Sequence, residues 1–274
     1  MNQPRLSLHD GQAIPQFGFG LWQIPEDDTA AAVATAARAG YRLFDGAAIY
    51  GNEAGLGQGL RDSGVPREAL FVTTKVWNSR QGHDSTLAAV EESLARLRLD
   101  RLDLVLIHWP CPAKELYVET WRALVRLREE GRVTSIGVSN FDALQIDRLA
   151  AETGVTPVLN QIEIHPRLPQ TALQAAMTAR GIVTQSWTPL GEGRSFAAAP
   201  VLAAAARTGL APAQVILRWH LQRGLSVIPR SVDPGHIAAN LAVLDAPPLT
   251  APEMAAITAL GTGERCGPDP AHFE

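Results

Sequence analysis

The chain of 274 residues carries 24 lysines and arginines against 28 aspartates and glutamates, a formal net charge of −4. This balance, without a basic stripe or a run of like charges, argues against nucleic acid and membranes as partners. The hydrophobic share of 46% predicts a globular protein with a sizeable core. The two cysteines, Cys111 and Cys266, match no metal or redox spacing, so we expect reduced thiols and a cytoplasmic location.

After a predicted hairpin over residues 5–16, strand patterns alternate with helical patterns along the whole chain. In the first half we predict strands at 17–20, 41–45, 70–75 and 102–108, and helices at 28–39, 53–61, 85–98 and 115–130. In the second half we predict strands at 133–139, 158–161, 182–187 and 225–228, and helices near 142–152, 170–179, 198–208, 212–222, 235–243 and 251–260.

Eight strand–helix units without a break in composition predict an α/β fold, a (β/α)8 TIM barrel with an N-terminal β-hairpin and extra helices near the C-terminus. We expect residues 1–274 to form one domain. The continuously apolar run Leu104–Ile107 suits a parallel sheet that is buried on both faces. A doubly wound sheet is the alternative, but no G-x-G-x-x-G segment follows any predicted strand.

In a barrel of this kind, functional residues lie at the C-terminal ends of the strands. The predicted strands here end at or next to Asp45, Lys75, His108, Ser139, Asn140, Gln161, Trp187 and Arg230. Most of these side chains can act in catalysis or ligand binding, whereas purely structural strand ends would show small turn-forming residues.

Tyr50 lies five residues after Asp45, in a loop before a helix that is predicted to start near Asn52 or Glu53, with Asn52 as its expected N-cap. For an isolated pair, a turn-capping carboxylate and a rim aromatic would be the default. Lys75 changes this interpretation, because an ammonium at an enclosed mouth needs a counter-charge such as Asp45. The same ammonium is expected to lower the pKa of Tyr50 and make it a usable general acid.

His108, if neutral, could donate a hydrogen bond to a substrate carbonyl and polarise it. No nucleophile with its own base and no G-x-S-x-G elbow is found in the sequence. An acid and a carbonyl polariser without a nucleophile indicate addition of hydride to a C=O group, with the hydride taken from a cofactor.

Three tryptophans follow predicted strands and are expected to wall the mouth. The predicted substrate-binding residues are Trp22, Ile49, Trp77, His108 and Trp109. Cys111 is expected to be a free thiol. Since no H-x-H or H-E-x-x-H spacing occurs, we predict no metal site and expect solvated or capping roles for His83, His165 and His220.

Six segments in this order resemble the aldo-keto reductases, most closely the bacterial branch that includes the 2,5-diketo-D-gluconate reductases. They are Asp45 with Tyr50–Glu53, Lys75–Asn78, Leu106–Pro110, Gly137–Phe141, Asn160–Glu163 and Ile228–Val232. The resemblance runs from the hairpin to Gly267–Pro270 and therefore covers nearly all of the chain.

The resemblance implies an NAD(P)H-dependent oxidoreductase that reduces aldehydes and ketones, with a catalytic tetrad of Asp45, Tyr50, Lys75 and His108 and with Tyr50 as proton donor. Ser139, Asn140 and Gln161 would bind the nicotinamide carboxamide. Trp187 would stack on the nicotinamide ring, with Trp22 also at the cofactor. The loop 189–194 would cover the pyrophosphate, and the adenosine half would be held from 230 to 240. The further cofactor residues implied are Pro189, Leu190, Gly191, Gly193, Arg230, Ser231, Val232, His236 and Asn240.

The chain departs from the family's usual lysine at 230, arginine at 236 and glutamate at 239, with Arg230, His236 and Ala239 in their place. Arg230 still offers a bidentate cation for a 2′-phosphate. His236 is mostly neutral at pH 7. We therefore predict that NADPH is favoured and NADH is usable.

The segment after Leu260 is short, which predicts an open pocket for small aldehydes, α-dicarbonyls, keto-sugars and keto esters. We expect a monomer. Two other functions stay open: a cofactor-binding barrel that senses redox state without turnover, and a metal-dependent barrel hydrolase that uses Asp45 and His108.

Overall fold

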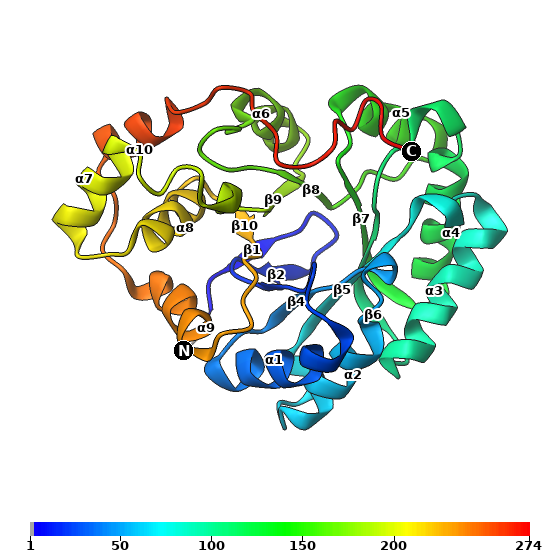
Figure 1. Cartoon of the computed structure of the whole chain (residues 1–274). Coiled ribbons are helices and arrows are strands. Elements are labelled where there is room, and N and C mark those ends of the chain that lie inside the picture. The colour runs from blue at the N-terminus through cyan, green and yellow to red at the C-terminus, as the bar shows by residue number, and fades with distance from the viewer. Residues whose placement is uncertain (1–2) are drawn as a thin grey trace.

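A computed structural model describes residues 3–274; residues 1 and 2, which the expected domain of 1–274 includes, lie outside the described residues. Eight parallel strands form one sheet in the order β10-β9-β8-β7-β6-β5-β4-β3 (Figure 1). The strands are β3 (Phe19–Gly20), β4 (Leu43–Asp45), β5 (Phe71–Val76), β6 (Leu102–Ile107), β7 (Val133–Ser139), β8 (Leu159–Glu163), β9 (Val183–Trp187) and β10 (Ser226–Val227).

The sheet closes into a barrel where its two edges meet. Phe17 forms a parallel bridge with Val227, and the Gly20 N–H donates to the Pro229 carbonyl at 3.1 Å. The first strand therefore begins at Phe19 instead of the predicted Phe17, because Phe17 pairs through this single bridge. The other strand boundaries lie within two residues of the predicted ones.

Helices surround the barrel in alternation with the strands, which confirms the predicted (β/α)8 architecture. They are α1 (Glu26–Ala39), α2 (Glu53–Asp62), α3 (His83–Leu97), α4 (Tyr117–Glu129), α5 (Ala143–Thr153), α6 (Thr171–Ala179), α7 (Ala199–Thr208), α8 (Pro212–Gln222), α9 (Pro234–Leu241) and α10 (Ala251–Thr258). The extra helices near the C-terminus are present as predicted. Asp142 shows how local sequence starts a helix, since its carboxylate accepts from the Gln145 N–H and caps α5.

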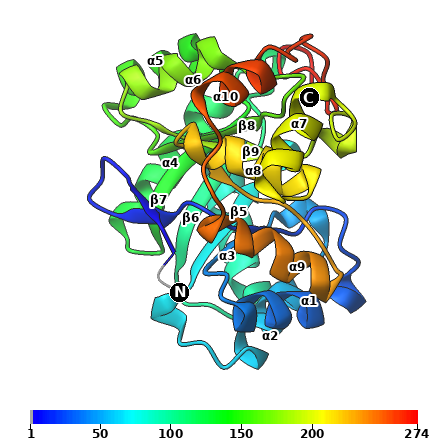
Figure 2. The same cartoon turned by 90° about the vertical axis from the view of Figure 1, so that its left-hand side faces the viewer.

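The hairpin of β1 (Arg5–Ser7) and β2 (Ala13–Pro15) closes one end of the barrel. Leu8 and Ile14 are buried against the barrel interior, and the Ser135 hydroxyl of β7 donates to Asp10 at 2.7 Å. Figure 2 shows this hairpin at one end and the C-terminal segment at the other. The end with the carboxyl termini of the strands is therefore left for a site.

Asn52 occupies the N-cap position of α2, but its side chain does not make the expected capping hydrogen bond. Its side-chain amide donates instead to the carbonyls of Leu21 and Ile24, at 3.0 and 2.9 Å. Asn52 thus ties the segment that carries Tyr50 to the loop after β3.

Within residues 3–274, no single helix is long and apolar enough to cross a membrane. The pair α7 and α8 meets the length and composition criteria together, but it is bent by 93° at its break.

Candidate active site

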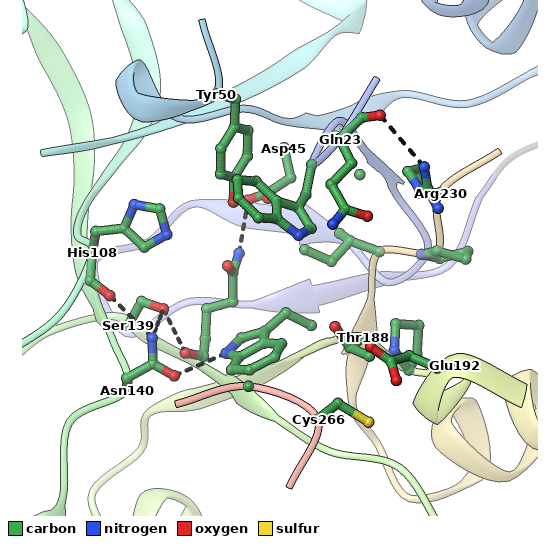
Figure 3. Close-up of a pocket in the computed structure, with 18 of the residues that line it drawn as sticks. Gln23, Asp45, Tyr50, His108, Ser139, Asn140, Thr188, Glu192, Arg230 and Cys266 are labelled. Carbon is green, nitrogen blue, oxygen red and sulfur yellow. Dashed lines mark hydrogen bonds between the residues drawn. The ribbon is translucent and has the colours of Figure 1, made fainter. Parts of the chain in front are cut away.

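A cavity of about 640 Å³ opens at the carboxyl ends of the strands (Figure 3). It collects side chains from all parts of the chain. The predicted residues that line it are Trp22, Asp45, Ile49, Tyr50, Trp77, His108, Trp109, Ser139, Asn140, Gln161, Trp187, Pro189, Leu190, Gly193 and Arg230.

A buried ion pair lies at the floor of this cavity. The Lys75 ammonium donates to Asp45 Oδ2 at 2.6 Å, to the Gly46 carbonyl at 2.8 Å and to the Tyr50 hydroxyl at 3.2 Å. Lys75 and Asp45 are 1% and 2% exposed. Since an ammonium has three N–H groups, these three acceptors satisfy it completely.

The protonation states of Lys75 and Tyr50 follow from burial and from their contact. Burial disfavours the Lys75 ammonium, but Asp45 and Tyr50 outweigh that effect, so the pKa of Lys75 is raised. Burial also raises the pKa of Tyr50, and the nearby Lys75 charge only partly opposes it. The sequence-based prediction of a lowered pKa for Tyr50 is therefore wrong, because burial is the larger effect. The phenol is protonated at neutral pH, which is the form a proton donor needs.

His108 faces Tyr50 across the cavity, with ring centres 5.7 Å apart. Burial and the Lys75 charge hold the pKa of His108 well below its ordinary value. The imidazole is therefore neutral and carries one N–H that can donate a hydrogen bond.

A second polar group lies on the ends of β7, β8 and β9. The Trp187 indole N–H donates to Asn140 Oδ1 at 2.8 Å, and the Asn140 amide donates to the His108 carbonyl at 3.0 Å. The Ser139 hydroxyl donates to the Gln161 carbonyl at 2.8 Å. Asn140 has a φ of 66°, a left-handed conformation that asparagine tolerates. These bonds fix the side chains before any ligand binds.

Gln161 connects this group to the ion pair through the barrel interior. Its amide nitrogen donates to Asp45 Oδ1 at 2.7 Å and to Gln185 Oε1 at 2.6 Å. The Gln185 amide in turn donates to the Ser226 hydroxyl at 2.9 Å. Gln185 and Ser226 were not singled out from the sequence, because Gln185 lies inside β9 and Ser226 begins β10, so neither stands at the carboxyl end of a strand.

Aromatic rings wall the cavity. Trp22 lies 5.0 Å from Tyr50, and Trp77 lies 5.0 Å from His108, between ring centres. Phe273, near the C-terminus, packs on Trp109 with ring centres 4.6 Å apart. The expectation that the segment after Leu260 leaves the mouth open is therefore wrong on this side, where that segment supplies a wall.

Some predicted residues do not reach the cavity wall. Lys75 lies beneath the cavity, and Gly191 packs against the His165 ring. His236 is mostly exposed on α9. The predicted residues that are absent from the cavity lining, as far as residues 3–274 show it, are Lys75, Gly191, Ser231, Val232, His236 and Asn240.

Other lining residues were not singled out from the sequence. Gln23, Thr188 and Glu192 have φ values of 60°, 47° and 54°, and no local pattern in the sequence signals these left-handed conformations. The C-terminal segment adds Cys266, Gly267, Pro268 and Phe273. Only the aromatic character of Phe273 could have drawn attention to this tail.

Two of the histidines that were expected to be solvated or capping are buried. The His220 ring lies between the Ser186 hydroxyl and the Pro189 carbonyl, at 3.1 and 2.9 Å. Burial is the main cause that lowers the pKa of His220 to about 3. His220 thereby holds the start of the loop that follows β9.

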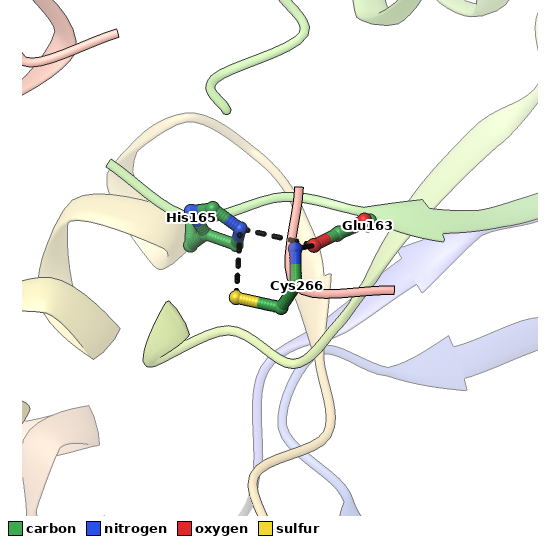
Figure 4. Close-up of side chains that lie close together, drawn as sticks. All are labelled: Glu163, His165 and Cys266. Carbon is green, nitrogen blue, oxygen red and sulfur yellow. Dashed lines mark hydrogen bonds and ion pairs between the residues drawn. The ribbon is translucent and has the colours of Figure 1, made fainter. Parts of the chain in front are cut away.

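The buried residues His165 and Glu163 lie against the half-buried Cys266 (Figure 4). Its Nε2 atom is 3.1 Å from Glu163 Oε1 and 3.5 Å from the Cys266 sulfur. Both contacts use the same nitrogen, so the ring cannot accept the thiol proton while a carboxylate orients its other nitrogen, as in a catalytic triad. Burial and then Glu163 raise the pKa of Cys266 to about 11, so this thiol is not an activated nucleophile.

The group instead anchors the C-terminal segment. Glu163 accepts hydrogen bonds from the backbone N–H groups of Cys266 and Gly267. A Cβ atom at Gly267 would clash with the Trp187 ring, so glycine permits this close approach. The wall that ends in Phe273 is thus fixed to the end of β8.

Comparison with known proteins identifies the family. Residues 16–262 match the sequence profile described as "Aldo/keto reductase family". The chain belongs to this family. The resemblance predicted from the motifs is confirmed, and this aldo-keto reductase is an oxidoreductase that acts on carbonyl groups.

Relatives match over almost the full chain. An aldo-keto reductase from Mycolicibacterium smegmatis is 49% identical over 270 residues, which are 98% of each chain. Methylglyoxal reductase DkgA from Yersinia pestis is 46% identical over 273 residues, covering 99% of this chain and 98% of that protein. A crystal structure of a Gox0644 mutant in complex with NADPH has a TM-score of 0.95 and 47% identity, with full coverage of both chains.

Proposed function

We propose that this aldo-keto reductase uses NADPH to reduce small aldehydes and ketones to alcohols, with Tyr50 as proton donor. The observation that carries the proposal is the Lys75 ammonium, which bridges the Asp45 carboxylate and the Tyr50 hydroxyl beneath the cavity. The neutral His108 faces the same space.

The residues present fit a nicotinamide cofactor. Gln161 lines the cavity, and its Oε1 atom has no partner among residues 3–274 and is not sealed from solvent, so it is free to accept from a carboxamide NH₂. Arg230 lies on the opposite side of the cavity from His108 and offers its guanidinium to a phosphate. The Gox0644 complex with NADPH and a Bombyx mori aldo-keto reductase complex with NADP support this cofactor.

We assign the cofactor contacts as the motifs implied. Ser139, Asn140 and Gln161 would hold the carboxamide, and Trp187 and Trp22 would flank the nicotinamide ring. The loop residues Pro189, Leu190, Gly191 and Gly193 would cover the pyrophosphate, and the adenosine half would meet Arg230, Ser231, Val232, His236 and Asn240. With Arg230 as the cation for a phosphate and His236 in place of the family's usual arginine, NADPH is favoured and NADH is usable. A kcat/KM that is larger with NADH than with NADPH would refute this preference.

When bound, the reduced nicotinamide would supply a hydride to the carbonyl carbon. His108 donates a hydrogen bond to the carbonyl oxygen and polarises it. Tyr50 gives its proton to that oxygen as negative charge develops there. The Lys75 ammonium stabilises the phenolate that remains, and Asp45 keeps Lys75 charged and in place. The phenol then regains a proton from solvent.

The cavity wall indicates the substrate class. Trp22, Ile49, Trp77, Trp109 and Phe273 give it a largely aromatic, apolar lining, and the cavity volume suits a small molecule beside a nicotinamide ring. Several relatives are named methylglyoxal reductase. We therefore propose small α-dicarbonyls, keto-sugars and keto esters as substrates.

The substitution Tyr50→Phe tests the function. We expect kcat/KM for carbonyl reduction to fall about 10²- to 10⁴-fold, with NADPH quenching of tryptophan fluorescence unchanged. Tyr117→Phe is the matched control, because Tyr117 packs on Phe141 away from the cavity lining. Full activity of Tyr50→Phe would refute Tyr50 as the acid.

Two other functions were left open by the sequence, a redox-sensing barrel without turnover and a metal-dependent barrel hydrolase. Membership of the aldo/keto reductase family favours neither of them.

We also propose that the chain acts as a cytoplasmic monomer and that residues 1–274 act as one domain. The support for one domain and for a reducing location is that all eight barrel strands join one sheet and that both cysteines are free. Sedimentation of the purified protein at micromolar concentration tests the monomer, and a dimer would refute it.

A further inference from the structure

A line of hydrogen bonds crosses the barrel interior from the ion pair to the hairpin. It runs from Asp45 through Gln161, Gln185 and Ser226 to the carbonyl of Pro15. Gln161 is 2% exposed, and Gln185 and Ser226 are fully buried. Water therefore cannot replace a lost partner along this line at no cost.

The direction of every bond in this line is fixed by its two ends. The Asp45 carboxylate, which is paired with Lys75, can only accept, so Gln161 must turn its amide nitrogen toward it. The second N–H of Gln161 then needs an acceptor, and Gln185 Oε1 supplies it at 2.6 Å. Gln185 must in turn donate to Ser226, which donates to the Pro15 carbonyl, an acceptor only. No amide in the line can flip without placing two donors or two acceptors against each other.

We propose that Gln185 is a positioning residue for the reduction. It holds the Gln161 side chain so that Gln161 Oε1 faces the cavity as an acceptor for the carboxamide NH₂ of the cofactor, and so that the Gln161 amide supports Asp45, the partner of Lys75. This inference rests on the proposed function and adds to it a residue that touches neither substrate nor cofactor.

Without Gln185 Oε1, one N–H of Gln161 is buried without a partner. The Gln161 side chain then gains by rotating toward another acceptor, and its oxygen leaves the orientation that the carboxamide needs. Binding of the cofactor must restore that orientation, so the loss is expected in cofactor affinity and not in carbonyl affinity.

The test is Gln185→Met, which keeps the length of the side chain and removes both hydrogen bonds. We expect the Kd for NADPH, measured by quenching of tryptophan fluorescence, to rise about 5- to 10-fold. The KM for the carbonyl substrate should stay within about twofold. The matched control is Thr184→Val on the same strand, because the buried Thr184 hydroxyl has no hydrogen-bond partner in the described chain. It should bind NADPH like the wild type.

Gln185→Glu adds a measurement, the pH dependence of NADPH binding, that would not change if Gln185 only stabilised the fold. A protonated glutamic acid can accept from Gln161 and donate to Ser226 as the amide does, whereas a carboxylate cannot donate and repels Asp45. The ratio of the Kd for NADPH of Gln185→Glu to that of the wild type should therefore be near one at pH 6 and larger at pH 8.5. A ratio that does not change with pH refutes the inference.

Further variants distinguish a wrong inference on Gln185 from a wrong cofactor site. If Gln185→Met does not fold, Ser226→Ala breaks the far end of the line and should weaken NADPH binding in the same direction. If Gln185→Met, or Ser226→Ala in its place, binds NADPH like the wild type while Gln161→Ala binds it weakly, the inference on Gln185 is wrong and the proposed function stands. If Gln161→Ala also binds NADPH normally, the proposed cofactor site itself is wrong.

Discussion

Replacing Lys75 by methionine should separate the two tasks of its ammonium, which are to neutralise Asp45 and to stabilise the Tyr50 phenolate. Breaking a buried ion pair by removing one partner costs about 3–5 kcal/mol of unfolding free energy. Here Asp45 keeps one hydrogen bond from Gln161 at 2.7 Å, so we expect the lower end, about 3 kcal/mol. For a chain of this size that corresponds to a fall in Tm of roughly 6–12 °C.

The same substitution leaves the Tyr50 phenolate without its counter-charge at 3.2 Å. We expect kcat to fall about 10²- to 10⁴-fold, the range for loss of an effective general acid. The double variant Asp45→Asn/Lys75→Met removes both charges. It should recover most of the lost Tm and none of the lost kcat.

Thermal unfolding followed by circular dichroism and steady-state NADPH oxidation measure the two effects on the same samples. A Lys75→Met variant as stable as the wild type would mean that the ion pair does not neutralise Asp45 as the structure implies. A double variant with restored kcat would mean that the ammonium has no part in proton transfer.

Two further predictions concern the surroundings of the site. The folded-state pKa of His220, about 3, lies below its ordinary value of 6.5, so its contribution to stability is present above pH 6.5 and is lost as the pH falls toward 3. Between pH 8 and pH 5 the free energy of unfolding of the wild type, measured with urea, should therefore fall by about 2 kcal/mol more than that of His220→Gln. Equal falls in the two proteins would contradict a neutral buried ring. Phe273→Ala removes the ring that packs on Trp109, so the KM for carbonyl substrates should rise severalfold with the Kd for NADPH unchanged. A change in NADPH affinity alone would place this ring at the cofactor.

The strand–helix order and the polar strand ends could be predicted because both are local patterns. Apolar runs mark the strands, and Asp45, Lys75 and His108 stand out where those runs stop. The line of hydrogen bonds from Asp45 through Gln161 and Gln185 to Ser226 could not be predicted in this way. Gln185 lies within a strand, and only the register between β8 and β9 places it opposite Gln161.

Two other features depend on the three-dimensional fold. Phe273 lies in a tail without periodicity, and its place on Trp109 depends on the anchor at Glu163. The direction of the pKa shift of Tyr50 depends on how deeply the phenol is buried, and sequence alone gives its neighbours but not its depth.

The raised pKa of Cys266 has a consequence for the chemical durability of the protein. Carbonyl compounds that are easily reduced are also electrophiles, and a thiolate, unlike a thiol, is a strong nucleophile toward them. Cys266 lines the cavity where such compounds bind. With a pKa of about 11, roughly one molecule in 10⁴ carries the thiolate at pH 7. The thiol that lines the cavity is therefore held mainly in its unreactive form, which slows the formation of thiol adducts with these electrophiles at this position.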